Sequence, residues 1–154
     1  MKKNSILPGL LGIIAICFTL MAFLFPLAPA ATTELGDIVY GYDLMLGNKA
    51  IAAFDTPIGA FIAVFVLFII SAFFQIMGTA FGFRGGKFTG FLHILSCGMM
   101  IASGVLCFLV SLLVKSDAVS VSLAWGFMAT GAASMVSALL SGFIGFSAFG
   151  KKKA

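Results

Sequence analysis

Charged residues are scarce in this sequence, which has nine basic and five acidic residues among 154, or 9% of the chain. A soluble domain carries about a quarter charged residues, so these few cannot cover a surface that faces water. Disorder is also excluded, because 62% of the residues are hydrophobic and the mean hydropathy is +1.20. The composition therefore predicts an integral membrane protein.

Residues that usually build catalytic or metal sites are scarce as well. His93 is the single histidine, and no acidic residue lies near it along the chain. The sequence contains no H-E-x-x-H, phosphate-loop or dinucleotide-binding motif. The three cysteines lie in apolar runs and form no C-x-x-C motif, so redox chemistry is not indicated. We therefore expect no enzymatic activity, no cofactor and no metal.

Long apolar runs are abundant instead. A helix needs about 20 apolar residues to cross the hydrocarbon layer of a membrane. Four runs meet this length: Ile6–Ala28, Ile58–Phe83, Phe88–Val114 and Val119–Phe149. They predict an all-α membrane protein, an up-and-down four-helix transmembrane bundle that forms one domain over residues 1–154. The first run has a rival interpretation as a cleavable leader, but its length favours a retained helix.

The charges are sorted between the two ends of these predicted helices. One end carries seven basic residues and no acidic residue: Lys2, Lys3, Arg84, Lys87, Lys151, Lys152 and Lys153. The other end carries two basic residues and all five acidic ones. Because basic residues concentrate on the cytoplasmic side, both termini should be cytoplasmic. The basic residues suit contact with anionic lipid and form no continuous groove for nucleic acid.

Residues 29–57, the outer segment, hold most of the polarity. Bulky apolar residues occupy every second position over residues 38–46, which predicts a half-buried strand, with a turn at Gly47-Asn48 and a helical turn over residues 50–54. We therefore expect a small outer cap that is partly β. The candidates for contact with a partner at this end are Tyr40, Tyr42, Asp43 and Trp125. The three aromatic residues also fit the belt found at membrane surfaces.

Small residues recur every four positions in the third and fourth runs, a spacing that allows helix backbones to approach closely. They are Gly98 and Ala102 in the third run, and Ala129, Ala133, Ser137, Ser141 and Gly145 in the fourth. These faces either pack within one bundle or bind another copy or a partner helix. The bulky Phe61, Phe65 and Phe68 of the second run are interpreted as a stripe that faces lipid or acts as a wedge.

Two polar side chains are expected inside the membrane. Gln75 and His93 lie at similar distances from the short connection between the second and third runs, so adjacent antiparallel helices would bring them to similar depth. A hydrogen bond between them would satisfy both side chains. A proton relay is the alternative hypothesis, but no buried carboxylate accompanies His93.

The layout resembles small, uncharacterised bacterial four-pass membrane proteins, which share a Lys-rich start and a Gly-Tyr/Phe-x-x-x-x-Gly element after the first span. Here that element is Gly41-Tyr42-Asp43-Leu44-Met45-Leu46-Gly47. The absence of an N-x-S/T glycosylation site fits a bacterial origin. A long first outer segment and a short second one also resemble claudins in layout. This chain lacks the Trp-containing motif and the paired cysteines of claudins in that segment, so their function is not implied.

The expected function follows mainly by elimination. No predicted helix has a central Gly/Pro break or a buried charge, which are the usual features of a transport site. We therefore expect a non-enzymatic membrane protein that acts by helix packing and through its outer segment, as a scaffold, an accessory subunit or a homo-oligomer. The lipid bilayer is one partner, and a second copy or another membrane protein is the other. A small channel or transporter is the alternative.

Overall fold

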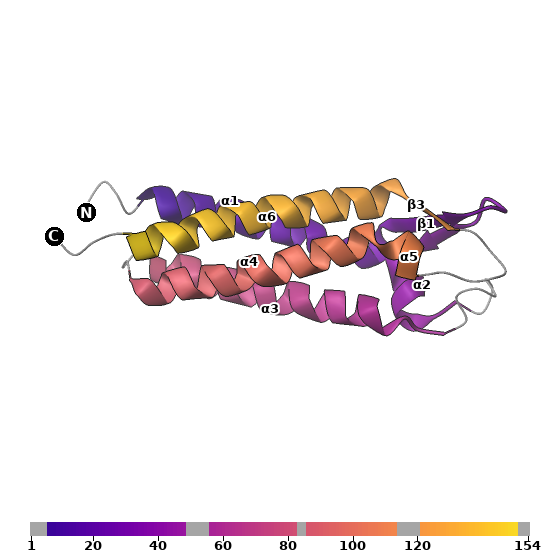
Figure 1. Cartoon of the computed structure of the whole chain (residues 1–154), viewed down its shortest axis with the longest axis horizontal. Coiled ribbons are helices and arrows are strands. Elements are labelled where there is room, and N and C mark those ends of the chain that lie inside the picture. The colour runs from indigo at the N-terminus through magenta and orange to yellow at the C-terminus, as the bar shows by residue number, and fades with distance from the viewer. Residues whose placement is uncertain (1–5, 49–55, 83–85, 114–120, 151–154) are drawn as a thin grey trace.

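The computed structural model describes residues 6–48, 56–82, 86–113 and 121–150, and four long helices dominate it (Figure 1). They are α1 (Ile6–Phe23), α3 (Gly59–Gly82), α4 (Lys87–Phe108) and α6 (Trp125–Gly150). The shorter elements are η1 (Phe25–Leu27), β1 (Pro29–Thr33), β2 (Ile38–Tyr40), α2 (Gly41–Leu46), α5 (Val110–Leu113) and β3 (Val121–Leu123). Each predicted apolar run thus corresponds to one long helix, with different bounds, and all four helices are long and apolar enough to cross a membrane.

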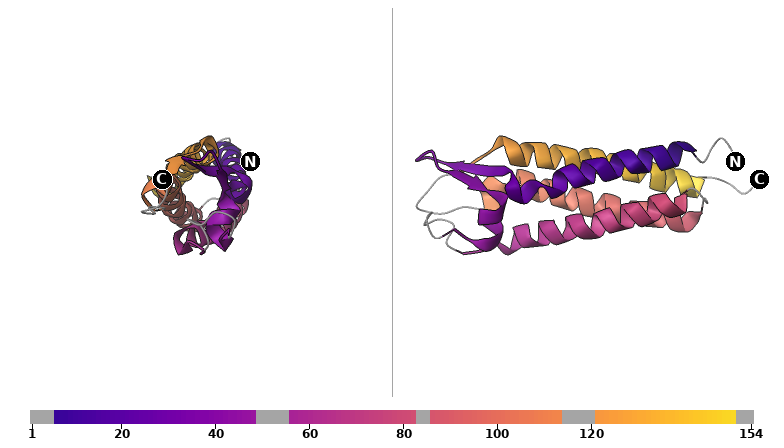
Figure 2. Two further views of the ribbon diagram at one scale, coloured as in Figure 1. Left: turned by 90° about the vertical axis from the view of Figure 1, so that its right-hand side faces the viewer. Right: turned by 180° about the vertical axis from the view of Figure 1, so that it is seen from behind.

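The four long helices lie side by side, and each contacts two neighbours. α1 and α4 run in one direction and α3 and α6 run in the other, so neighbouring helices are antiparallel (Figure 1). The residues at which α1 begins and α6 ends, Ile6 and Gly150, lie together at one end, which we call the terminal end. The strands and α2 lie at the opposite end, which we call the cap end (Figure 2).

A three-stranded antiparallel sheet covers part of the cap end, with β1 in the centre of the order β2-β1-β3. Ala31 of β1 pairs with Val39 of β2 on one side and with Leu123 of β3 on the other. The sequence prediction of a fourth helix from Val119 is therefore wrong at its start, because Val121–Leu123 forms β3. This pairing joins segments about 90 residues apart, so no local pattern in the sequence indicates it.

The predicted strand over residues 38–46 ends early, at Tyr40, and α2 follows it. Asp43 stabilises the start of this helix, because its Oδ2 accepts a hydrogen bond from the Tyr40 backbone N–H at 2.9 Å. Gly41 is required at the corner, since a Cβ there would lie 2.8 Å from the Cα of Pro26. The strand prediction is thus correct for Ile38–Tyr40 only, because the helix cap formed by Asp43 favours a helix over the residues that follow.

α2 ends at Leu46 and is followed by Gly47, whose positive φ of +81° is a backbone conformation that glycine adopts readily and other residues rarely do. The helix therefore ends directly before the predicted turn at Gly47-Asn48, and residues 49–55 lie outside the described part of the chain. The backbone N–H of Ile58 then donates to the Leu44 carbonyl at 2.8 Å, which fixes the entry into α3 beneath α2. The helical turn predicted over residues 50–54 lies outside the described residues.

Phenylalanine rings fill the interior near the cap end, and those of Phe25, Phe61, Phe68 and Phe127 are fully buried. The centroid of the Phe127 ring lies 5.7 Å from that of Phe25 and 5.6 Å from that of Phe61. We call these four residues the aromatic cluster. The interpretation of Phe61 and Phe68 as facing lipid is wrong, because their side of α3 packs against η1 and α6. Phe65 is half-buried beside them.

Candidate functional site

Midway along the four long helices the interior is polar. Thr19 on α1, Gln75 on α3, and Ser137 and Ser141 on α6 are fully buried there. We call these four residues the polar cluster. Burying polar groups is unfavourable unless each finds a hydrogen-bond partner, so the contacts within the cluster decide whether it stabilises the protein.

Three members of the polar cluster form a closed ring of hydrogen bonds. The Oε1 of Gln75 can only accept, so the Thr19 hydroxyl donates to it at 2.7 Å. The Nε2 of Gln75 donates to the Oγ of Ser137 at 2.8 Å and to the Oγ of Ser141 at 3.0 Å. The single hydroxyl proton of Ser137 closes the ring when it is donated to the Thr19 Oγ1 at 2.7 Å, and the Ala15 carbonyl at 3.0 Å is the alternative acceptor for that proton. Both ends of the Gln75 amide are engaged, and α1, α3 and α6 are joined at one point.

α4 is joined to this region by other contacts. The hydroxyl groups of Ser71 on α3 and Ser96 on α4 hydrogen-bond to each other at 2.6 Å, and both residues are fully buried. The Met100 Sδ on α4 lies 3.9 Å from the Thr19 Oγ1. All four long helices therefore meet through polar or sulfur contacts near the middle of their length.

The predicted hydrogen bond between Gln75 and His93 is wrong. Gln75 uses its amide for Thr19, Ser137 and Ser141, and His93 has no hydrogen bond to any described residue. α3 and α4 are adjacent, but His93 lies at the level of Gly78, about one helical turn from Gln75 toward the terminal end. Gln75 instead extends across the interior to hydrogen-bond partners on α1 and α6.

His93 is almost completely buried and lies against α3, where a Cβ on Gly78 would be 3.0 Å from its Nε2 and Cδ2 atoms. Its Nδ1 is buried without a hydrogen-bond partner in the described part of the chain, and so is the Oγ1 of the neighbouring Thr79. Within that part of the chain no three His, Cys, Asp or Glu residues lie close enough to hold a metal ion. His93 is therefore a buried polar residue outside the polar cluster.

The small residues predicted for packing on α6 divide into two groups. Ala133, Ser137, Ser141 and Gly145 are buried between helices, whereas Ala129 is exposed. The backbones of α4 and α6 approach closely at Gly145, where a Cβ would lie 3.0 Å from the Gly90 carbonyl oxygen. Most of this predicted line therefore packs within the chain.

The predicted packing of Gly98 and Ala102 on α4 within the bundle is wrong. Both residues are exposed, and a Cβ on Gly98 would meet no atom within 4 Å. The face of α4 that contacts α6 carries Gly90 and Gly104 instead. Their separation of fourteen residues, nearly four helical turns, places them on one face. A pattern of small residues at every fourth position does not include this pair, because fourteen is not a multiple of four.

The four candidate contact residues at the cap end have different surroundings. Asp43 is buried, and its two carboxylate oxygens accept hydrogen bonds from the Tyr40 backbone and the Asn48 Nδ2. It holds α2 in place and is not available to a partner, which corrects the prediction for this residue. The rings of Tyr40 and Tyr42 stack with a centroid distance of 5.5 Å, and Tyr42 is exposed.

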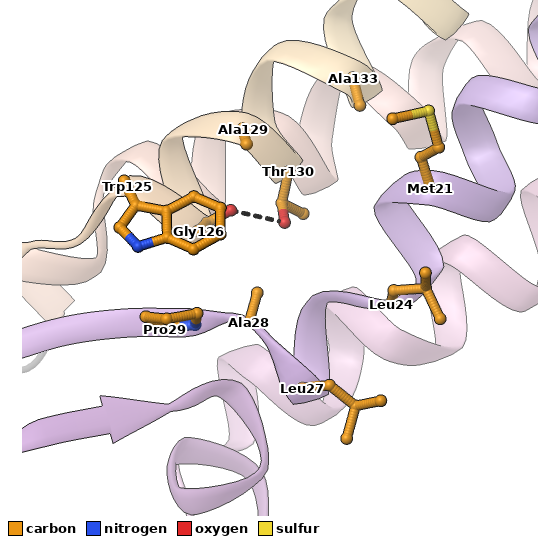
Figure 3. Close-up of a pocket in the computed structure, with 10 residues that line it drawn as sticks. All are labelled: Met21, Leu24, Leu27, Ala28, Pro29, Trp125, Gly126, Ala129, Thr130 and Ala133. Carbon is orange, nitrogen blue, oxygen red and sulfur yellow. Dashed lines mark hydrogen bonds between the residues drawn. The ribbon is translucent and has the colours of Figure 1, made fainter.

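Trp125 is the first residue of α6, and 69% of it is exposed. It lies at one end of an apolar groove of about 460 Å³ between α6 and the junction of α1, η1 and β1 (Figure 3). Met21, Leu24 and Leu27 form one side of this groove, and the opposite side is formed by Gly126, Ala129, Thr130 and Ala133. The exposed Ala129 thus belongs to a groove that opens to the surroundings.

Comparison of the chain with protein-family models, with curated proteins and with solved structures finds no match.

Proposed function

We propose that the chain is a multi-pass protein of the cell membrane, in which the four long helices form an up-and-down transmembrane bundle. The distribution of side chains supports this proposal. The outward surfaces carry exposed, large apolar residues such as Leu10, Ile69 and Phe143, whereas the polar cluster is buried. Lipid solvates an apolar outer surface well, and interior polar groups must then be satisfied within the protein. The basic residues favour cytoplasmic termini.

Reporter fusions test this topology. A reporter that is active only in the cytoplasm should be active after Ala154 and inactive when inserted after Asn48. A reporter that is active only outside should give the opposite pattern. An external carboxyl terminus would contradict the proposal, because it would require either an inverted bundle or an odd number of crossings.

We propose further that the protein acts without catalysis, through contacts with itself or with another membrane protein. The observation that carries this proposal is the closed ring of Thr19, Gln75 and Ser137, which is fully buried and joins three helices. Conduction or transport along the interior would have to break this ring and displace the aromatic cluster. The surfaces that remain free for function are therefore external, at the cap end and along the apolar groove.

The cap end has the exposed apolar residues that a contact surface needs. Leu35, at the turn between β1 and β2, is 85% exposed, and Tyr42 and Trp125 are exposed as well. Aromatic residues are enriched at the centres of protein interfaces. A scaffold, an accessory subunit and a homo-oligomer would all use such a surface, so the experiment must identify the partner.

Site-specific photo-crosslinking in native membranes tests the contact function. A photoreactive phenylalanine analogue at Tyr42 should give one discrete protein adduct, whose mass distinguishes a second copy from another protein. The same analogue at the exposed Phe91 on α4, near the terminal end, is the matched control and should give only lipid adducts. Absence of any protein adduct at Tyr42, Leu35 and Trp125 would contradict a contact function of the cap.

A small channel or transporter is the second candidate, and the unpartnered Nδ1 of His93 and Oγ1 of Thr79 favour it. Intramembrane polar groups without partners often mark a path for ions or substrates. Single cysteines along α6 distinguish the two proposals. Labelling of interior positions such as Ser137 from both sides of the membrane would support the channel and contradict the scaffold.

A further inference from the structure

The terminal end of the four long helices contains a small cavity of about 80 Å³. It is lined by residues of all four helices and by the residue before α4: Pro8, Gly82, Gly86, Thr89, Ile144, Ser147 and Ala148. A water molecule occupies about 30 Å³ in the liquid, so the cavity has room for two or three. The Thr89 and Ser147 hydroxyl groups give it the polar lining that water requires, and neither hydrogen-bonds to a described residue.

The Oγ1 of Thr79 and the Nδ1 of His93, which have no hydrogen-bond partner in the described part of the chain, belong to residues one helical turn further into the protein than the cavity lining. His93 follows Thr89 by four residues on α4, and Thr79 precedes Gly82 by three residues on α3. Gly12 on α1, four residues after Pro8, lies at the same level as Thr79, because a Cβ on Gly12 would lie 2.9 Å from the Thr79 Cγ2. The Nε2 and Cδ2 atoms of His93 lie against Gly78, which is adjacent to Thr79, so the two residues sit at the same level above the cavity.

We infer that the terminal end binds a short chain of water molecules, which enters through the cavity lined by Thr89 and Ser147 and ends at Thr79 and His93. Buried polar atoms in native proteins almost always have a partner, and internal water supplies it where the protein does not. The Thr79 Oγ1 and the His93 Nδ1 are the buried atoms that need one here. Ser103, which is also unpartnered, lies ten residues from His93 toward the cap end and belongs to another level.

The water chain stops below the polar cluster. Both hydrogens on the Gln75 Nε2 are donated to serine hydroxyls and its Oε1 accepts from Thr19, so Gln75 has no free N–H for water, and the residue is fully buried. Beyond it lies the aromatic cluster, whose rings are fully buried. The interior is thus hydrated from the terminal end only. This inference goes beyond the contact function, and the two can fail independently.

The composition makes the test direct, because His93 is the only histidine and Gln75 the only glutamine in the chain. Nitrogen-15 labelling of these two residue types gives one set of side-chain signals from each in solid-state NMR of the full chain in lipid bilayers. Transfer of magnetisation from water should build up several-fold faster at the His93 ring than at the Gln75 amide. Equal, slow build-up at both would overturn the inference, because the terminal end would be dry. Equal, fast build-up would overturn it as well, because water would pass Gln75.

Two variants locate the entry of water. Ser147→Leu places a larger apolar group in the cavity and should lower the build-up at His93 to the Gln75 level. Ala132→Leu adds bulk at an exposed position of the same helix and should leave the ratio unchanged. Thr89→Val, which removes a hydroxyl without adding bulk, should lower the His93 build-up if Ser147→Leu does not fold. An unchanged ratio in the folded cavity variants would overturn the proposed entry.

Discussion

The side-chain amide of Gln75 on α3 donates to the hydroxyl of Ser137 on α6 at 2.8 Å, and neither residue is exposed. The two residues lie 62 positions apart in the sequence. Their bond spans the interior, since α3 and α6 each pack mainly against α1 and α4. It therefore ties two helices that are opposite each other, and the Thr19 hydroxyl closes the ring from α1.

Gln75→Leu should lower the free energy of unfolding by about 1–2 kcal/mol, because interhelical hydrogen bonds in membrane proteins contribute modestly. The loss is limited since the Thr19 and Ser137 hydroxyls keep the Ala15 carbonyl as an acceptor. Reversible unfolding in mixed micelles measures the change, and Ile76→Leu at an exposed neighbouring position is the control. Equal stability of Gln75→Leu and the native chain would show that the hydrogen-bonded ring adds nothing to the free energy of unfolding.

Ser137→Leu should destabilise the protein more than Gln75→Leu does. The larger side chain must displace close-packed helices, at a typical cost of about 1–3 kcal/mol, and it also breaks the ring. Ala132→Leu adds bulk at an exposed position on α6 and should cost little. Melting temperature and mass in detergent are measured for both variants. A loss of mass without a loss of melting temperature would instead indicate that Ser137 lies at an interface between copies.

Gly145→Ala and Gly98→Ala form a matched pair that separates buried from outward glycines. A Cβ on Gly145 would lie 3.0 Å from the Gly90 carbonyl oxygen, so the substitution should lower the melting temperature. A Cβ on Gly98 meets nothing within 4 Å, and alanine favours a helix over glycine by about 1 kcal/mol. Gly98→Ala should therefore leave the melting temperature unchanged or raise it. A marked fall in the melting temperature of Gly98→Ala in native membranes would reveal a partner helix at Gly98.

Asp43→Ala should loosen the cap end without affecting the long helices. It removes the acceptor for the Tyr40 backbone N–H and for the Asn48 side chain, and loss of a helix cap costs about 0.5–2 kcal/mol. Amide hydrogen exchange over residues 40–47 should become faster, while exchange in α6 stays the same. Asp37→Ala, at an exposed position in the preceding turn, is the control. Unchanged exchange at Tyr40 would contradict the capping role.

The sequence by itself determined the four long apolar helices and the separation of charges between their ends. The physical reason is that these features depend on transfer from water to hydrocarbon, which each residue experiences independently of its neighbours in space. The end of α2 at Gly47 follows equally from the local conformational freedom of glycine. These predictions required no knowledge of which helix faces are in contact.

Only the tertiary structure decided how the helices are rotated about their axes. The outside of this chain is apolar and much of its interior is small or polar, so hydrophobic periodicity gives little information about which face packs. Gly98 therefore lies outward while Gly90 and Gly104 pack, and Gln75 finds Thr19 and Ser137 in place of His93. The same holds for β3, whose pairing with β1 depends on a segment far away in the sequence. Contacts of this kind are set by the simultaneous packing of several elements, and no single stretch of sequence contains them.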